Sequence, residues 1–128
     1  REELKVIVID YSDKRPIYEQ IVERLCTLIL NGVLEADEKL PSVRSLAVEL
    51  SINPNTIQRA YGELERSGFI YSVKGKGNFV CADGAAREQE KEKMLNELKE
   101  QLKTYREAGI ARKEIDFCVT AVFGEVEV

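Results

Sequence analysis

The chain has 128 residues, which is enough for one domain or one small domain with an appendage and too few for an architecture such as an α/β barrel. A hydrophobic fraction of 44% supports a packed core, while a net charge of -4 argues mildly against a generic nucleic-acid binder, since such proteins are basic overall. The absence of histidine excludes Ser-His triads, Cys-His dyads and His-ligated zinc sites.

The cysteines predict neither a disulfide framework nor a metal site. Cys26, Cys81 and Cys118 are odd in number and far apart in the sequence, so a reduced intracellular compartment is expected. No apolar stretch approaches the roughly 20 residues that cross a bilayer, and the charged run at residues 1–4 differs from a secretory signal. We therefore expect a cytoplasmic protein with no metal, no cofactor and no membrane partner.

The charges are distributed unevenly along the chain. Residues 39–77 carry six basic and three acidic side chains, a net charge of +3, whereas residues 1–38 and 78–128 have net charges of -4 and -3. A positive face can attract phosphate on an acidic protein, because charges are screened beyond about 8 Å at physiological salt. On this count alone, chance scatter of the charges explains the pattern equally well.

The first expected elements are a strand and a helix. Residues 4–9 form a β-branched run that is typical of a short strand or an extended N-terminal arm. Pro16 suits the first position of a helix, which the spacing of apolar residues extends to about Asn31, and Gly32 ends it. The apolar residues at steps of three and four are Ile17, Ile21, Leu25 and Leu28.

Two short helices separated by residues 51–53 follow. Ser42 is suited to cap a helix whose apolar residues repeat over residues 43–50. Asn53 as N-cap and Pro54 as first residue begin the next helix, which ends at Gly68. This arrangement predicts a helix-turn-helix.

The outer face of the second of these helices is polar near its N-terminus. Recognition helices reach base edges from this position, where Asn and Gln suit adenine and Arg suits guanine or phosphate. An ordinary solvated helix face is the alternative explanation for each residue taken singly. The residues concerned are Asn55, Thr56, Gln58 and Arg59.

A β-hairpin with a basic tip is expected next. Two strand-like runs, residues 69–73 and 78–81, flank the sequence KGKG at residues 74–77. The glycines also suggest a phosphate loop, but the dinucleotide pattern requires a third glycine where Val80 stands, so we do not expect a nucleotide site.

The composition changes near residues 83 and 84, which predicts a winged helix-turn-helix domain at 1–83 and a helical tail at 84–128. Helices are expected at about 85–108 and 111–123, each with one apolar stripe, and Cys118 is expected in a core position. The stripes require burial against each other, against the first domain or against a second copy, the last of which makes a dimerisation tail. The candidate dimerisation residues are Leu95, Leu98, Leu102, Tyr105, Ile115, Phe117, Val119 and Val122.

Several motifs in order resemble those of the GntR family of bacterial transcriptional regulators. They are PIY at 16–18, LPSVRSLA at 40–47, NPNTIQRAY at 53–61, LE at 64–65, Gly68 and GKGNFV at 75–80. The resemblance covers roughly residues 4–82, and the short two-helix tail is similar to that of the YtrA subfamily, whose members lack a large effector domain and are often paired with transporter genes. It implies a mostly α, α+β fold: an N-terminal winged helix-turn-helix followed by a two-helix tail.

The resemblance also implies which residues face DNA. It places the helix-turn-helix against the major groove and the hairpin tip in the minor groove. Gln58 stands where a basic residue is frequent and Asn78 where Thr is usual, and both differences are expected to change the preferred operator. The candidate DNA-binding residues are Ser42, Arg44, Asn53, Asn55, Thr56, Gln58, Arg59, Tyr61, Lys74, Gly75 and Lys76.

The leading hypothesis is a homodimeric repressor that binds an inverted-repeat DNA operator, with a transporter operon as a candidate target. The alternative is a winged-helix module that docks a protein instead of DNA. An enzyme is not expected, because no convergent catalytic set can be named. A small-molecule effector stays open, bound at a dimer interface or between tail and winged helix, with Tyr105 and Arg106 as candidate contacts.

Overall fold

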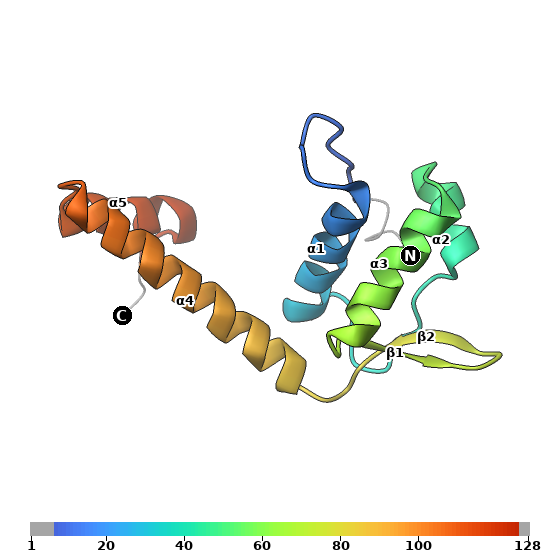
Figure 1. Ribbon diagram of the computed structural model, residues 1–128. Coiled ribbons are helices and arrows are strands. Elements are labelled where there is room, and N and C mark those ends of the chain that lie inside the picture. Colours follow the sequence, from blue (N-terminus) through green and yellow to red (C-terminus); the bar gives the residue numbers. More distant parts are fainter. Residues whose placement is uncertain (1–6, 126–128) are drawn as a thin grey trace. The chain divides into compact units, whose positions relative to one another are not determined.

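The computed structural model describes residues 7–125 and divides them into two compact units, the first ending at Glu88 and the second beginning at Gln89 (Figure 1). Within residues 7–125, no helix is long and apolar enough to cross a membrane. The elements are α1 (Ile17–Leu30), α2 (Val43–Leu50), α3 (Pro54–Arg66), β1 (Ile70–Val73), β2 (Gly77–Val80), α4 (Ala85–Glu107) and α5 (Arg112–Phe123). All five expected helices are confirmed, with ends that differ from the predictions by at most two residues.

The predicted N-terminal strand or extended arm, residues 4–9, falls partly on residues outside the described part. Residues 7–10 are described and form no strand. They are held by Gln20, which is buried in α1: its Nε2 donates to the carbonyl of Asp10 at 3.0 Å and its Oε1 accepts from the Asp10 N–H at 2.9 Å. A buried amide satisfied in this way fixes the extended segment against the helix without leaving a polar group unpaired.

Side-chain caps set the starts of both helices of the helix-turn-helix, as the sequence predicted. The Ser42 hydroxyl accepts from the Ser45 N–H at 3.0 Å, and the Asn53 carboxamide accepts from the Asn55 N–H at 2.8 Å. Between the helices, Ser51 has a φ of 55°, which reverses the chain within three residues. Pro16 differs slightly from its prediction, because it is the N-cap of α1 and not its first residue.

The hydrophobic core lies between α1, α2, α3 and the hairpin. Its fully buried large side chains come from each of these elements because the apolar faces predicted by spacing all converge there. They include Ile21 and Leu25 of α1, Leu46 of α2, Ile57 and Leu64 of α3, Ile70 of β1 and Val80 of β2.

The hairpin differs in detail from its prediction. β1 and β2 pair antiparallel with Val73 opposite Gly77, so the tip has three residues rather than four and the second strand begins one residue earlier. Gly77 can pair at this point because its φ of 122° is accessible to glycine. The hairpin also pairs with the segment before α2, through a bridge between Lys39 and Phe79 and a hydrogen bond of 2.9 Å from the Leu40 N–H to the Asn78 carbonyl.

The helices α4 and α5 of the tail are joined by a turn at Gly109, whose φ is 89°. Glu114 caps α5 by accepting from the Ala111 N–H at 2.8 Å. Neither helix contains a fully buried residue, so the apolar stripes stay largely exposed in the single chain. Cys118, expected in a core, is exposed for the same reason.

Candidate nucleic-acid interface

Helix α3 separates an apolar inner face from a polar outer face. Ile57, Ala60 and Leu64 are buried and pack toward α1 and α2. Asn55, Gln58 and Arg59 are exposed on the other side, and Thr56 is half-buried at its edge. Three of the four predicted reading-face residues therefore present their side chains to solvent on one side of one helix.

Ser42 and Asn53 have structural tasks at this surface. Each is exposed, and its side-chain oxygen accepts a hydrogen bond that caps its own helix. The N-termini of α2 and α3 therefore begin at well-defined points with Arg44 exposed in the first turn of α2. Helix N-termini carry partial positive charge, which favours phosphate nearby.

Tyr61, one of the candidate DNA contacts, is instead a core residue. Its side chain is 2% exposed, and its hydroxyl donates to the Pro41 carbonyl at 2.8 Å. Burial, with a smaller contribution from the carboxylate of Glu49, raises the pKa of Tyr61 above its ordinary value. The prediction was wrong because Tyr61 shares the inner face of α3 with Ile57 and Leu64, where no ligand can reach it.

Arg59 makes a contact that its spacing on α3 does not reveal. Its guanidinium carbon lies 3.8 Å from the ring centroid of Tyr18, which belongs to the first turn of α1. A cation over the face of an aromatic ring at this distance is a cation–π pair. Tyr18, the one aromatic residue of α1, was not among the predicted site residues, because the sequence does not show that its ring lies against α3.

The hairpin tip is basic and open to solvent. Lys74, Gly75 and Lys76 are all exposed there. Lys39 joins them from outside the hairpin: an added Cβ at Gly77 would lie 3.1 Å from the Lys39 Cε, so the lysine stem runs across this glycine. The sequence showed Lys39 within the basic segment but could not place it on the hairpin, because only the bridge to Phe79 brings it there.

The base of the hairpin is stiffened by side-chain contacts. The rings of Tyr71 and Phe79 stack across the two strands with centroids 5.5 Å apart. The Tyr71 hydroxyl donates to Asp37 at 2.9 Å, and this hydrogen bond raises the pKa of Tyr71. These contacts fix the direction in which the lysine-bearing tip projects from the first unit.

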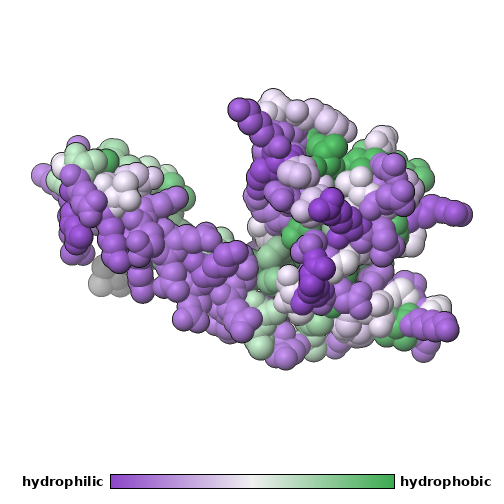
Figure 2. Space-filling model, viewed as in Figure 1, coloured by the Kyte–Doolittle hydropathy of each residue, from purple (hydrophilic) through white to green (hydrophobic). Residues whose placement is uncertain are grey.

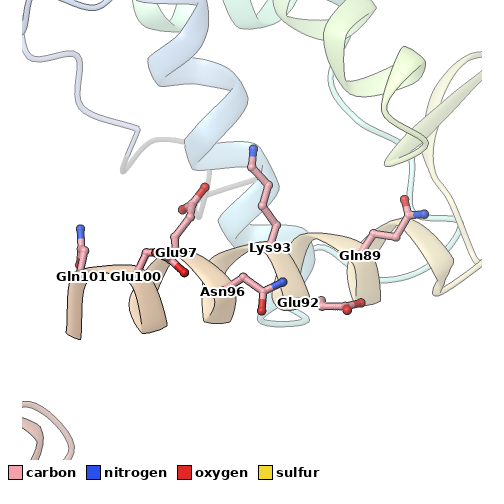
Figure 3. Close-up of a pocket in the computed structure, with 7 residues that line it drawn as sticks. All are labelled: Gln89, Glu92, Lys93, Asn96, Glu97, Glu100 and Gln101. Atoms are coloured by element: carbon pink, nitrogen blue, oxygen red, sulfur yellow. The ribbon is translucent and has the colours of Figure 1, made fainter. Parts of the chain in front are cut away.

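The second unit has an open hollow along α4 that is lined by polar and charged residues. Its lining residues all come from this one helix, and Figure 3 shows their side chains pointing in several directions rather than converging. Among residues 7–125, no group of three or more Cys, Asp or Glu side chains is placed to hold a metal ion. The residues lining the hollow are Gln89, Glu92, Lys93, Asn96, Glu97, Glu100 and Gln101.

The candidate dimerisation residues form exposed apolar surface on the tail. Figure 2 shows hydrophobic side chains gathered over α5, while α4 is mostly hydrophilic. Leu102 and Ile115 are half-buried, and the others are at least 40% exposed. The exposed ones are Leu95, Leu98, Tyr105, Phe117, Val119 and Val122.

Three comparisons with known proteins place this arrangement in a family. The HTH-type transcriptional repressor YtrA of Bacillus subtilis is 42% identical over 98 residues, which cover 77% of this chain and 74% of the relative. A GntR family transcriptional regulator from Listeria monocytogenes superposes with a TM-score of 0.74 at 40% identity, covering 90% of this chain and 98% of that structure.

A solved complex with an operator is similar to about half of this chain. AraR(DBD) in complex with operator ORX1 superposes with a TM-score of 0.50 at 34% identity, covering 52% of this chain and 81% of that one. Residues 17–80 match the family described as "Bacterial regulatory proteins, gntR family". The chain, a winged helix-turn-helix followed by two helices, belongs to the GntR family of transcriptional regulators.

Proposed function

We propose that this protein is a homodimeric transcriptional repressor that binds an inverted-repeat DNA operator. The observation that carries the proposal is the juxtaposition, within one compact unit, of an exposed polar face on α3 and a hairpin whose exposed tip bears lysines. The relative named as the YtrA repressor and the operator complex of AraR(DBD) support it. The net charge of -4 is no obstacle, since the cations gather on the first unit between residues 39 and 77.

Sequence reading is assigned to the exposed amides of α3. The side-chain amides of Asn55 and Gln58 each carry a donor and an acceptor. Each amide can therefore form two hydrogen bonds to the edge of an adenine in the major groove. Neither residue's side chain has a hydrogen-bond partner of its own among the described residues, so both are available for bases. Thr56 at the edge of the face suits contact with a thymine methyl or a phosphate.

Affinity is assigned to the cations around this face. Arg44, Lys74 and Lys76 are exposed, and Lys39 lies along the same hairpin. Each phosphate that such a side chain neutralises releases a counterion from the DNA, so their summed effect appears as salt dependence. These contacts orient the protein without reading sequence.

The homodimer is assigned to the tail. Phe117 and Val122 are 78% and 80% exposed in the single chain, and Phe123 next to them is 84% exposed. A run of exposed large apolar side chains on a helix is costly in water and marks an interaction surface. A two-fold dimer would present two α3 helices to half-sites about 34 Å apart, one turn of the DNA helix.

Selection from a randomised duplex pool at two salt concentrations, followed by sequencing, tests the proposal. Enrichment of an inverted repeat with steep salt dependence is the expected result. Retention of no particular sequence, with weak and salt-insensitive binding, would contradict it and favour a winged-helix module that docks a protein. Sedimentation of the free protein measures the dimer separately, so loss of the dimer alone would leave the DNA assignment intact.

A further inference from the structure

The contact between Arg59 and Tyr18 joins the polar face of α3 to a different helix. The guanidinium carbon of Arg59 lies 3.8 Å from the ring centroid, while Tyr18 itself is half-buried in the first turn of α1. The packing of α1 against α3 therefore fixes where the ring stands. An exposed arginine on a helix surface ordinarily samples many rotamers. The contact with the Tyr18 ring restricts the rotamers of Arg59, because the ring is itself held in place.

Two other arginines of the first unit are held differently. Arg15 forms ion pairs with Asp13 and Glu23, and Arg66 pairs with Glu63. Among residues 7–125, no ion pair to a carboxylate is formed by Arg59. Its positive charge is therefore not cancelled by an acidic partner.

A carboxylate partner and an aromatic partner leave different parts of an arginine side chain free to bind an anion. A carboxylate occupies the N–H edge of a guanidinium, which is the edge that binds phosphate. An aromatic ring covers the flat face of the group and leaves the N–H groups around its rim available. The acidic side chain next to the ring, Glu19, is 3.4 Å from the Tyr18 hydroxyl and accepts its hydrogen bond there.

We propose that Tyr18 is a positioning residue for DNA binding, which holds the Arg59 guanidinium on its ring and presents its N–H groups to the DNA. The inference deepens the proposed function and depends on it. Ordering a long side chain on binding weakens affinity by about three- to tenfold, and a side chain that is already ordered in the free protein avoids this loss. Tyr18 thereby contributes to DNA affinity from a helix that reads no bases.

Two substitutions at position 18 separate the ring from the hydroxyl. Tyr18→Leu keeps apolar packing against the core but removes the ring, and Tyr18→Phe keeps the ring and removes the hydroxyl. Anisotropy titrations with the selected operator are expected to show about three- to tenfold weaker binding for the leucine variant and unchanged binding for the phenylalanine variant. Equal affinity of the leucine variant and the wild-type protein would overturn the role of Tyr18.

The arginine supplies the matched control. In an Arg59→Ala background, Tyr18→Leu is expected to cause no further loss, because the side chain it positions is gone. The same fold loss in both backgrounds would mean that Tyr18 supports folding rather than Arg59, and would refute the proposal. Thermal melts of all variants show whether Tyr18→Leu lowers the stability of the fold in general. Tyr18→Phe, which keeps the ring, should retain both the melting temperature and the DNA affinity of the wild-type protein.

Salt dependence provides an independent readout. If the stacked Arg59 contacts a phosphate, Arg59→Ala should reduce the slope of log affinity against log salt by about 0.9. Tyr18→Leu should then reduce the same slope by a smaller amount. A wild-type protein that binds no duplex would reject the proposed function together with this role. A wild-type protein that binds, with a Tyr18→Leu variant of unchanged affinity and slope, would reject the role of Tyr18 alone.

Discussion

The Tyr61 hydroxyl donates to the Pro41 carbonyl at 2.8 Å and so ties the middle of α3 to the residue that precedes the cap of α2. The two groups are 20 residues apart in the sequence. Since Pro41 stands immediately before Ser42, this bond helps to fix how α2 and α3 cross. A residue expected to touch DNA therefore acts on the geometry of the helix-turn-helix from inside the core.

Removal of this hydroxyl should destabilise the fold without creating a cavity. Tyr61→Phe is expected to lower the free energy of unfolding by about 1 kcal/mol, because the Pro41 carbonyl loses its partner. Urea denaturation measures the change. An unchanged midpoint would show that water replaces the hydroxyl without loss.

The raised pKa of Tyr61 makes a further prediction about alkaline pH. The unfolded chain ionises this hydroxyl near its ordinary pKa of 10.0, while burial keeps it protonated in the fold to higher pH. The contribution of Tyr61 to stability is therefore complete below about pH 10 and falls above it, by up to about 1.4 kcal/mol per pH unit. Tyr61→Phe should remove this part of the pH dependence, which parallel denaturation curves of the two proteins at pH 9 and pH 11 will show.

The lysines of the hairpin should act on affinity and not on sequence preference. Lys74→Ala and Lys76→Ala are each expected to weaken binding to all duplexes by a similar factor and to reduce the salt slope by about 0.9. Lys103→Ala, on α4 and paired with Glu100 at 2.9 Å, is the matched control and should change neither quantity. A shift of the selected sequence by either hairpin variant would contradict the assignment.

Gln58 should act on sequence preference. Gln58→Ala is expected to relax selection at one position in each half-site, at a cost of about 1–3 kcal/mol for the preferred base. Repetition of the selection experiment with the variant measures it. An identical enriched sequence would show that the reading face of α3 is assigned wrongly.

Gly77 should tolerate substitution less well than Gly75. An alanine at Gly77 would have to adopt a φ of 122° with its Cβ 3.1 Å from the Lys39 Cε, whereas Gly75, with a φ of 78°, has open space around it. We expect Gly75→Ala to cost about 1–2 kcal/mol and Gly77→Ala to cost more and to weaken DNA binding, because Lys39 is displaced. Thermal melts and anisotropy titrations of both variants test the order, and equal costs would contradict it.

The exposed apolar side chains of α5 should be needed for assembly and not for folding. Phe117→Glu and Val122→Glu are expected to give monomers with unchanged helical content, because both side chains are exposed in the single chain. Lys113→Ala, also exposed on α5, is the control and should stay dimeric. Sedimentation and circular dichroism measure these outcomes, and a dimeric glutamate variant would place the interface elsewhere.

Local sequence chemistry determined most of the helical framework. The caps Ser42 and Asn53, the first-turn Pro54 and the apolar spacing of each helix act over a few residues, so they predict helix positions without knowledge of the rest of the chain. The exposed polar face of α3 followed from the same periodicity. The apolar character of the tail was also evident, although its exposure in the single chain was not.

Tertiary packing decided the contacts between elements. Periodicity placed Tyr61 on α3 but did not show that its hydroxyl donates to the Pro41 carbonyl. Nor did it show that the Arg59 guanidinium stacks on the Tyr18 ring, or that the Lys39 side chain packs over Gly77. Each of these pairs joins residues separated by 20 to 41 positions, whose proximity depends on how helices and hairpin pack around one core. Sequence alone therefore determined which surface carries the polar and basic side chains, and the packed fold decided which of them are buried, supported or free to meet a ligand.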